Sequence, residues 1–373
     1  MSNPAAKAYD DILYEGFPFP QSHPDRLATI ATLLGMKPAA LNDCRVLEIG
    51  CGEGENLAPV AYTLPSSSFV GIDMSEVALS RGREAIAALG LKNLRLQTLD
   101  VREVTPAFGT FDYIIAHGVY TWVPTDVQER ILSICKENLA PDGVAYISYC
   151  CYPGGRIREM ERDILLFHTR DFEDPRQKIE QAVALGAMIA KAGGRDDSYR
   201  QVLKEDLDCA TAMEGAVLFH DELSPHLSHL YFQEFARRAA EHGLQFLAEA
   251  DYHEMQYRSW PAEVVPLLEE LAQRDPILKE QYLDFFKCRR FRQTLLCHAG
   301  VPLQRDPPPE RVVDLYVASV ANASTPRPDL TPGIVVEFRG RKGASLATDH
   351  QLSKAALIAL RAAWPCPPGC GCR

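Results

Sequence analysis

Three glycines and several acidic side chains surround one turn near residue 50. An apolar run over 46–49 that contains Glu48 leads directly into Gly50, Gly52 and Gly54, and a helix pattern then begins at Asn56. Glycine permits positive φ and lets a ligand approach the backbone closely, and the start of a helix offers unpaired N–H groups. The spacing therefore predicts a strand, a glycine turn and a helix that together hold a nucleoside-type ligand.

The charges at this turn distinguish between two such ligands. The dinucleotide fingerprint places its third glycine where this chain has Glu55, and Glu48 and Glu53 lie close by. Three carboxylates repel a pyrophosphate, whereas they attract the sulfonium and ammonium groups of S-adenosylmethionine. A tight turn without a ligand is the alternative. We predict S-adenosylmethionine as the cofactor, held at this turn by Glu48, Gly50, Cys51, Gly52, Gly54 and Asn56.

Two further acids end predicted strands. Asp73 ends a strand over 69–73, and Asp100 follows a strand over 94–99. In a parallel sheet the carboxyl ends of the strands meet at the edge where ligands bind. We expect Asp73 to accept the ribose hydroxyls and Asp100 to accept the adenine amine, the alternative for each being a capping or turn aspartate. The predicted cofactor contacts are completed by Met74, Val101 and Ala116.

The pattern of the chain predicts an α/β fold. Strand and helix patterns alternate over 46–151, which is typical of a Rossmann-like, doubly wound parallel sheet. The pattern becomes helical over 152–225, and the sheet resumes over 226–300 with a second helical stretch within 261–290. We interpret the helical stretches as insertions, or a middle domain, in one sheet-based unit.

The two ends of the chain differ from this unit. Residues 1–45 form a lead-in whose prolines and aromatic residues make either a lid over the cofactor or a strap packed on the sheet. Residues 301–373 follow a proline-rich linker and are predicted to form a small, truncated α+β domain. The three thiols of Cys366, Cys370 and Cys372 make an incomplete zinc site, so we expect a disordered tail and no metal.

Composition excludes several classes of protein. The chain has 373 residues, 46% of them hydrophobic, and a formal net charge of −11, which argues against a general nucleic-acid binder because Lys and Arg contacts to phosphate dominate that affinity. It contains no apolar run long enough to span a membrane and no signal-peptide pattern at residues 1–16. We therefore expect a cytoplasmic protein that does not insert into membranes.

Aromatic and imidazole side chains follow the fourth predicted strand. They are His117, Tyr120 and Trp122, and Tyr14 lies in the lead-in. Methyl transfer from a sulfonium is a direct displacement, so the protein needs only to align and dehydrate the reactants. The three rings can shape an amine pocket through cation–π contacts, His117 can accept a proton, and the motif 220–222 can orient an amine. The alternatives are packing rings, a backbone-bonded histidine, and a helix-capping or solvent-facing motif.

Longer segments resemble one bacterial family. EIGCGEG (48–54), Asp73, Asp100 and FDY (111–113) resemble class I S-adenosylmethionine-dependent methyltransferases. A narrower resemblance, to bacterial methyltransferases that carry a methyltransferase regulatory domain, is found in FPFPQSHP (17–24), AHGVYTWVP (116–124), HDELSP (220–225) and FRQTLLCH (291–298). The resemblance implies a middle domain associated with dimerisation and protein-substrate contact. Members usually continue into a fuller C-terminal domain resembling a winged helix, and this chain departs from that pattern.

Both the site residues and the family resemblance indicate a function. The residues predict an S-adenosylmethionine-dependent methyltransferase, and characterised members of the resembled family methylate lysines of outer-membrane proteins. We therefore expect a protein-lysine N-methyltransferase, with a homodimer implied by the resemblance. Two alternatives stay open: a methyltransferase acting on a small molecule or natural product, and a module that binds S-adenosylmethionine without catalysis.

Overall fold

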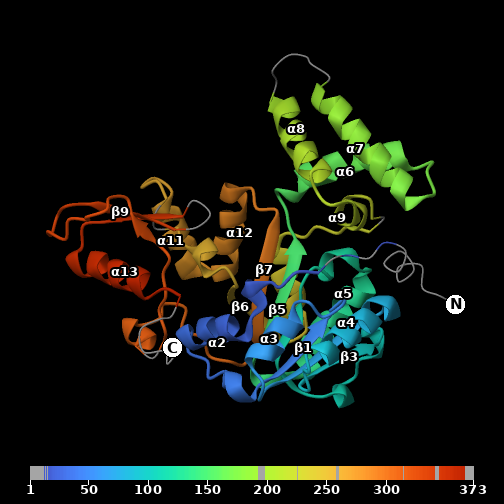
Figure 1. Cartoon of the computed structure of the whole chain (residues 1–373). Coiled ribbons are helices and arrows are strands. Elements are labelled where there is room, and N and C mark those ends of the chain that lie inside the picture. The colour runs from blue at the N-terminus through green and yellow to red at the C-terminus, as the bar shows by residue number, and fades with distance from the viewer. Residues whose placement is uncertain are drawn as a thin grey trace. The chain divides into compact units, whose positions relative to one another are not determined.

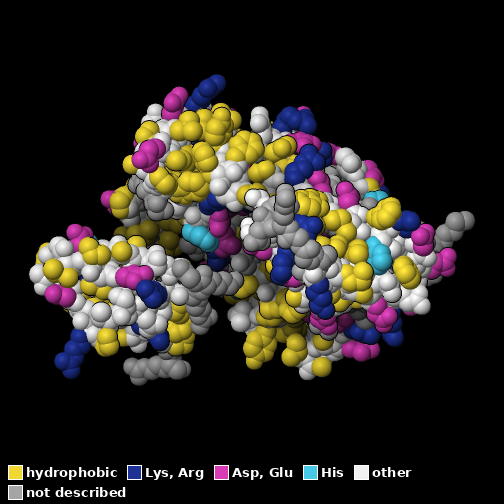
Figure 2. Space-filling model, turned by 90° about the horizontal axis from the view of Figure 1, so that it is seen from above, with side chains coloured by type: hydrophobic (Ala, Val, Ile, Leu, Met, Phe, Trp, Pro, Cys, Tyr) yellow, Lys and Arg dark blue, Asp and Glu magenta, His cyan; other side chains and the backbone are white. Residues whose placement is uncertain are grey.

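The computed structural model describes residues 12, 14, 16–191, 198–224, 226–257, 260–313, 315–340 and 344–365. The chain divides into two compact units, Met1–Asp306 and Pro307–Arg373. None of the helices in the described part combines the length and the apolar character needed to cross a bilayer. On the face shown in Figure 2, acidic and basic side chains are interspersed among hydrophobic ones.

The first unit is built on a seven-stranded sheet in the order β3-β2-β1-β4-β5-β7-β6 (Figure 1). Neighbouring strands from β3 to β5 are parallel, and β7 is antiparallel to both of its neighbours. This confirms the predicted Rossmann-like sheet. The strands are β1 Arg45–Ile49, β2 Ser68–Asp73, β3 Leu94–Thr98, β4 Phe111–Ala116, β5 Leu139–Cys150, β6 Leu244–Glu249 and β7 Phe291–His298.

Two hydrophobic clusters cover the two faces of this sheet, because successive side chains of a strand point to opposite faces. Strand β5 shows the alternation: Tyr146 belongs to one cluster, whereas Ile147 and Tyr149 belong to the other. The first cluster includes side chains of α2 Pro24–Leu33, α3 Leu57–Thr63 and α4 Glu76–Ala88. The second includes side chains of α5 Thr125–Glu137 and α10 Phe232–Glu241.

A helical insertion separates β5 from α10. It contains α6 Gly155–Thr169, α7 Pro175–Lys191, α8 Ser198–Thr211, α9 Gly215–Val217 and a π-helical turn, Leu218–Glu222. Leu165, Leu203, Leu207 and Leu218 form part of its own small core. The chain leaves and re-enters the sheet at adjacent points, since Cys151 bridges Leu230 and the Tyr152 N–H donates to the Leu230 carbonyl at 3.0 Å.

The predicted second helical stretch consists of two helices between β6 and β7. They are α11 Val265–Arg274 and α12 Pro276–Lys287. The break lies at Asp275, whose side chain accepts a hydrogen bond from the Ile277 N–H and so caps α12, with Pro276 at its first position.

The second unit is a small mixed α+β domain, as the sequence predicts. Its antiparallel strands are β8 Asn322–Ala323, β9 Val336–Arg339 and β10 Ser345–Thr348, and its helix is α13 Gln351–Ala363. The buried Lys354 ammonium donates to the carbonyls of Asp329, Thr331 and Ile334 at 2.9, 2.7 and 2.9 Å, which ties α13 to the chain before β9. The predicted cysteine tail lies outside the described residues.

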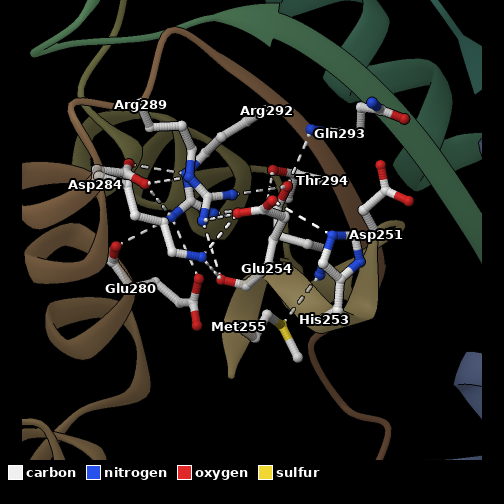
Figure 3. A network of polar contacts seen from close by, with 12 residues as sticks. Asp251, His253, Glu254, Met255, Glu280, Asp284, Arg289, Arg292, Gln293 and Thr294 are labelled. Atoms are coloured by element: carbon white, nitrogen blue, oxygen red, sulfur yellow. Dashed lines mark hydrogen bonds and ion pairs between the residues drawn. The ribbon is translucent and has the colours of Figure 1, made fainter. Parts of the chain in front are cut away.

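A buried ion network joins β6, β7 and α12 (Figure 3). The Arg292 side chain is 0% exposed, and its guanidinium contacts Glu249 Oε1 at 2.6 Å, Asp284 Oδ1 at 2.8 Å and Glu280 Oε2 at 3.3 Å. Its Cζ also lies 3.8 Å from the ring centroid of Phe232 on α10. One cation therefore holds together segments that are distant in the sequence.

Replacing Arg292 by methionine should destabilise the chain by about 3–5 kcal/mol, because the buried carboxylates around it lose the cation that they share and keep only their contacts to Arg289 and Lys279. Urea unfolding measures this loss. The matched control is Arg237→Met, whose side chain is 60% exposed and pairs with Glu241 on the surface of α10, and which should change the free energy of unfolding by less than about 0.5 kcal/mol. Equal losses in the two variants would contradict the structural role of the network.

Candidate cofactor and acceptor site

The glycine turn after β1 has the backbone that its sequence predicts. Gly50, Gly52 and Gly54 have φ values of +69°, +53° and +82°, which residues with a Cβ rarely adopt. A Cβ at Gly50 would also lie 2.3 Å from Val119 Cγ2, whereas one at Gly52 would meet nothing nearer than Glu55 Oε2 at 3.9 Å. The turn therefore leaves open space beside Gly52.

Asp73 joins this turn to the start of α4. Its Oδ2 accepts from the Gly52 N–H and its Oδ1 accepts from the Ser75 N–H, both at 2.9 Å. A carboxylate has about four acceptor positions, so two remain for ligand hydroxyls. Met74, the next residue, is half-buried.

Glu48 is 3% exposed and only half satisfied. Its Oε1 accepts from Asn56 Nδ2 at 2.7 Å, while its Oε2 has no hydrogen-bond partner in the described structure. Burial raises the pKa of Glu48 to about 8; the Asn56 hydrogen bond opposes this shift, and the charges of Glu55 and Asp73 add to it. A buried acceptor without a donor is rare, and a ligand ammonium would satisfy it.

Two predicted cofactor residues have their side chains engaged elsewhere. Asn56 bonds to Glu48 and to Ser22 Oγ at 3.0 Å, and its Oδ1 accepts from the Phe19 N–H at 2.8 Å. The Cys51 thiol packs against Gly71 of β2, where a Cβ would lie 2.7 Å from Sγ. Asn56 therefore connects the lead-in to the turn, and Cys51 can contact a ligand only through its backbone.

The acid after β3 adopts a local turn. Asp100 Oδ1 accepts from the Arg102 N–H at 2.9 Å, and its carboxylate pairs with the Arg102 guanidinium at 3.3 Å. Val101 is buried behind it, and Ala116 is fully buried at the end of β4. These contacts are those of a turn aspartate. The contact of Asp100 with the adenine amine stays a prediction.

His117 begins the loop after β4 and is packed on both sides. Its ring stacks on Phe19 at 3.5 Å between centroids and on Tyr146 at 5.8 Å. Nδ1 lies 2.8 Å from Tyr146 Oη, and the Gly118 N–H donates to Ser148 Oγ at 2.8 Å. Burial lowers the pKa of His117 to about 4. The imidazole is therefore neutral at pH 7 and offers a lone pair as a hydrogen-bond acceptor; its part in taking up a proton stays a prediction.

Tyr120, one of the two aromatic candidates in this loop, is a packing residue, so its predicted place beside the acceptor is wrong. Tyr120 is 0% exposed and packs in the hydrophobic core edge-on against Phe235, 5.4 Å between centroids. Its ring cannot face an acceptor, because the core encloses it. Trp122 instead lies beneath two guanidiniums of α6, with the Cζ atoms of Arg158 and Arg162 at 5.4 and 5.9 Å from its ring.

The motif at 220–222 occupies the π-helical turn, a conformation frequent at functional sites. His220 and Glu222 are 6% and 1% exposed, so the solvent-facing alternative is wrong. Arg158 Nη2 lies 2.6 Å from Glu222 Oε1 but 3.8 Å from Asp221 Oδ2, and 24% of the Asp221 side chain is exposed. Burial raises the pKa of Asp221 to about 6.

Tyr14 joins this turn from the lead-in. Its ring lies 5.8 Å from His220, whose Nε2 bonds to the Ile12 carbonyl at 2.6 Å. Burial and the nearby Asp221 carboxylate raise the pKa of Tyr14 to about 12. Arg158 also donates to Cys150 Sγ at 3.3 Å, so the turn lies beyond the carboxyl ends of β4 and β5, where the sheet binds ligands.

Sequence reasoning missed Arg158, Arg162, Tyr146 and Gln293. The two arginines are four residues apart on a predicted helix and therefore share a face, a signal that could have been used. Tyr146 and Gln293 meet only through the pairing of β5 with β7, for which the sequence carries no local signal.

Residues 41–194 match the model of a methyltransferase domain, and residues 214–298 match that of a predicted methyltransferase regulatory domain. Uncharacterized protein RP028 of Rickettsia prowazekii is 32% identical over 241 residues, which are 64% of this chain and 96% of that protein. The chain belongs to this family of methyltransferases with a regulatory domain.

Two larger Rickettsia proteins extend the comparison. Uncharacterized protein RP789 of Rickettsia prowazekii is 36% identical over 299 residues, so the match covers 80% of this chain and about half, 54%, of that relative. The structure of PKMT2 from Rickettsia typhi in complex with AdoHcy superposes with a TM-score of 0.85 at 29% identity and covers 95% of this chain and 69% of that one. These matches confirm the class I methyltransferase fold.

The cofactor of this methyltransferase family is S-adenosylmethionine, and the site fits it. The open space at Gly52, the free acceptor positions of Asp73 and the unpartnered Glu48 Oε2 match a ligand with ribose hydroxyls and an ammonium. Acids rather than lysines surround the turn, as a ligand without phosphate requires.

Replacing Glu48 by glutamine should stabilise the folded chain at high pH. The amide keeps an acceptor for Asn56 and removes a carboxyl whose pKa is raised from 4.5 to about 8. The wild-type carboxyl stabilises the fold while it is protonated and loses this contribution as the pH rises through about 8. Near pH 9 the free energy of unfolding of the variant should exceed that of wild type by about 1–3 kcal/mol, and this difference should shrink toward pH 5.

Urea unfolding across this pH range makes the measurement. Glu84→Gln, on the exposed face of α4, is the matched control and should show no such trend. A difference between wild type and Glu48→Gln that does not depend on pH would contradict the buried, unpaired carboxyl.

Proposed function

We propose that the protein transfers a methyl group from S-adenosylmethionine to the amine of a protein lysine. Support comes from the family membership, from the fit of the turn to this cofactor, and from the single observation that an acid with spare acceptor capacity, Asp221, lies beside Tyr14 at the ligand edge of the sheet. An acidic, aromatic setting of this kind matches an ammonium-bearing side chain.

In this proposal the turn residues hold the cofactor. Glu48 pairs with its ammonium, Asp73 accepts from its ribose hydroxyls, and Gly50, Gly52 and Gly54 admit it to the backbone. When bound, S-adenosylmethionine supplies the methyl group, which passes to the amine nitrogen as the N–C bond forms and the S–C bond breaks, leaving S-adenosylhomocysteine.

The acceptor side must bind a cation and deliver a neutral amine. A free lysine has a pKa of about 10.4, so deprotonation at pH 7 costs roughly 4.6 kcal/mol, and burial beside a sulfonium lowers this cost. Asp221 receives the ammonium, with Tyr14 as the flanking ring, because the Trp122 ring already lies against two guanidiniums of α6. The neutral imidazole of His117 accepts a hydrogen bond from the deprotonated amine, whose proton has passed to water.

The test is release of S-adenosylhomocysteine by the purified chain incubated with a membrane-protein extract of its host, followed by mass mapping of methylated peptides. Methylated lysines that are absent with Asp73→Ala are the expected result. Cofactor binding by calorimetry without any protein methylation would favour a small-molecule acceptor or a binding module, and failure to bind the cofactor would overturn the proposal entirely.

Asp221→Asn should raise the KM for the lysine substrate about tenfold, the equivalent of one charge-assisted hydrogen bond of about 1.5 kcal/mol. The cofactor Kd should not change, because Asp221 belongs to the acceptor side. Asp163→Asn, on an exposed position of α6 in the same insertion, is the matched control. An unchanged KM in Asp221→Asn would remove this residue from the acceptor site.

A further inference from the structure

A chain of hydrogen bonds runs from the loop after β4 to the antiparallel strand β7. His117 Nδ1 lies 2.8 Å from Tyr146 Oη, and the Tyr146 hydroxyl donates to Gln293 Oε1 at 2.9 Å. Both partners come from the sheet, Tyr146 from β5 and Gln293 from β7. No hydrogen bond to His117 Nε2 comes from the residues that the structure describes.

This chain fixes where the protons lie. Tyrosine has one O–H, and Tyr146 gives it to Gln293, so Tyr146 Oη must accept from His117. Nδ1 therefore carries the imidazole proton, and Nε2 carries the free lone pair. The low pKa of His117 agrees, because a ring that stays neutral has only one N–H to place.

The strand that carries Gln293 is held firmly. Its backbone N–H donates to Glu249 Oε2 at 3.0 Å, and Glu249 Oε1 pairs with Arg292 at 2.6 Å. Arg292 and Gln293 are neighbours on β7 and point to opposite faces, and Figure 3 shows the Gln293 side chain directed away from the guanidinium cluster. The ion network thus anchors the backbone on one side while the amide serves the site on the other.

We infer that Gln293 is a positioning residue for the reaction: through the Tyr146 hydroxyl it sets the tautomer of His117, so that Nε2 accepts a hydrogen bond from the acceptor amine and directs the lone pair of the amine. The inference rests on the proposed methyl transfer. It assigns to a residue of β7 a part in chemistry that takes place at the end of β4.

The decisive variant is Gln293→Met, which has a similar length and no acceptor of comparable strength. The Tyr146 hydroxyl then has no acceptor on β7 and turns its proton toward His117 Nδ1, so the proton of the ring moves to Nε2. Nitrogen NMR of protein labelled in its histidine rings reads the tautomer directly, with the His117 signals assigned from their loss in His117→Gln. We expect an Nδ1–H ring in wild type and an Nε2–H ring in Gln293→Met.

Kinetics supply the second readout. In Gln293→Met, kcat should fall about 10–100-fold, less than the 10²–10⁴-fold typical of removing a catalytic acid or base, while the cofactor Kd and the acceptor KM change less than about threefold. Gln245→Met on β6, whose amide donates to the carbonyls of residues 298, 299 and 301, is the matched control and should retain full kcat.

Two tyrosine variants on β5 distinguish the loss of the hydrogen-bond chain from a general loss of packing. Tyr146→Phe should lower kcat as Gln293→Met does, whereas Tyr149→Phe, whose buried hydroxyl lies 3.2 Å from Thr294 Oγ1 and belongs to the cluster on the other face, should not. Equal effects of the two would overturn the inference. If the wild-type protein is active but its His117 ring carries the proton on Nε2, the inference is wrong and the proposed function stands. If the wild-type protein transfers no methyl group, the proposed function itself is wrong.

Discussion

The structure depends on the burial of one full charge. The Arg292 side chain has no exposed surface, and burying an isolated guanidinium there costs far too much free energy unless carboxylates surround it. Glu249 comes from β6, while Glu280 and Asp284 come from α12, so β6, β7 and α12 must meet at one point. This requirement fixes the last two strands of the sheet and, through them, the position of β5.

Side chains of strand β5 contact both the loop after β4 and the helical insertion. Tyr146 and Ser148 lie on one face of it and hold His117 and Gly118 of the loop after β4. Cys150, two residues further along the same face, accepts from Arg158 of the helical insertion. The loop after β4 and the helical insertion are thus positioned by alternate residues of a single strand.

The sequence could predict what is encoded locally. The three glycines, the capping Ser75 and the acids after β2 and β3 are features of short stretches, and alternating patterns give the parallel strands. The sequence left the burial of Tyr120 as one of two alternatives, because the contact with Phe235 that decides it exists only once α10 packs on the sheet. The Tyr146–Gln293 bond joins residues 147 positions apart, and the pairing of Trp122 with two arginines needs the insertion to fold back over β4 and β5.

The place where the helical insertion leaves and rejoins the sheet has an evolutionary meaning. Cys151 and Leu230 are bridged neighbours, so some 80 residues by the numbering begin and end at almost the same point, a geometry that tolerates exchange of the inserted segment. The length and surface of that segment can therefore change without altering the strand register or the cofactor turn.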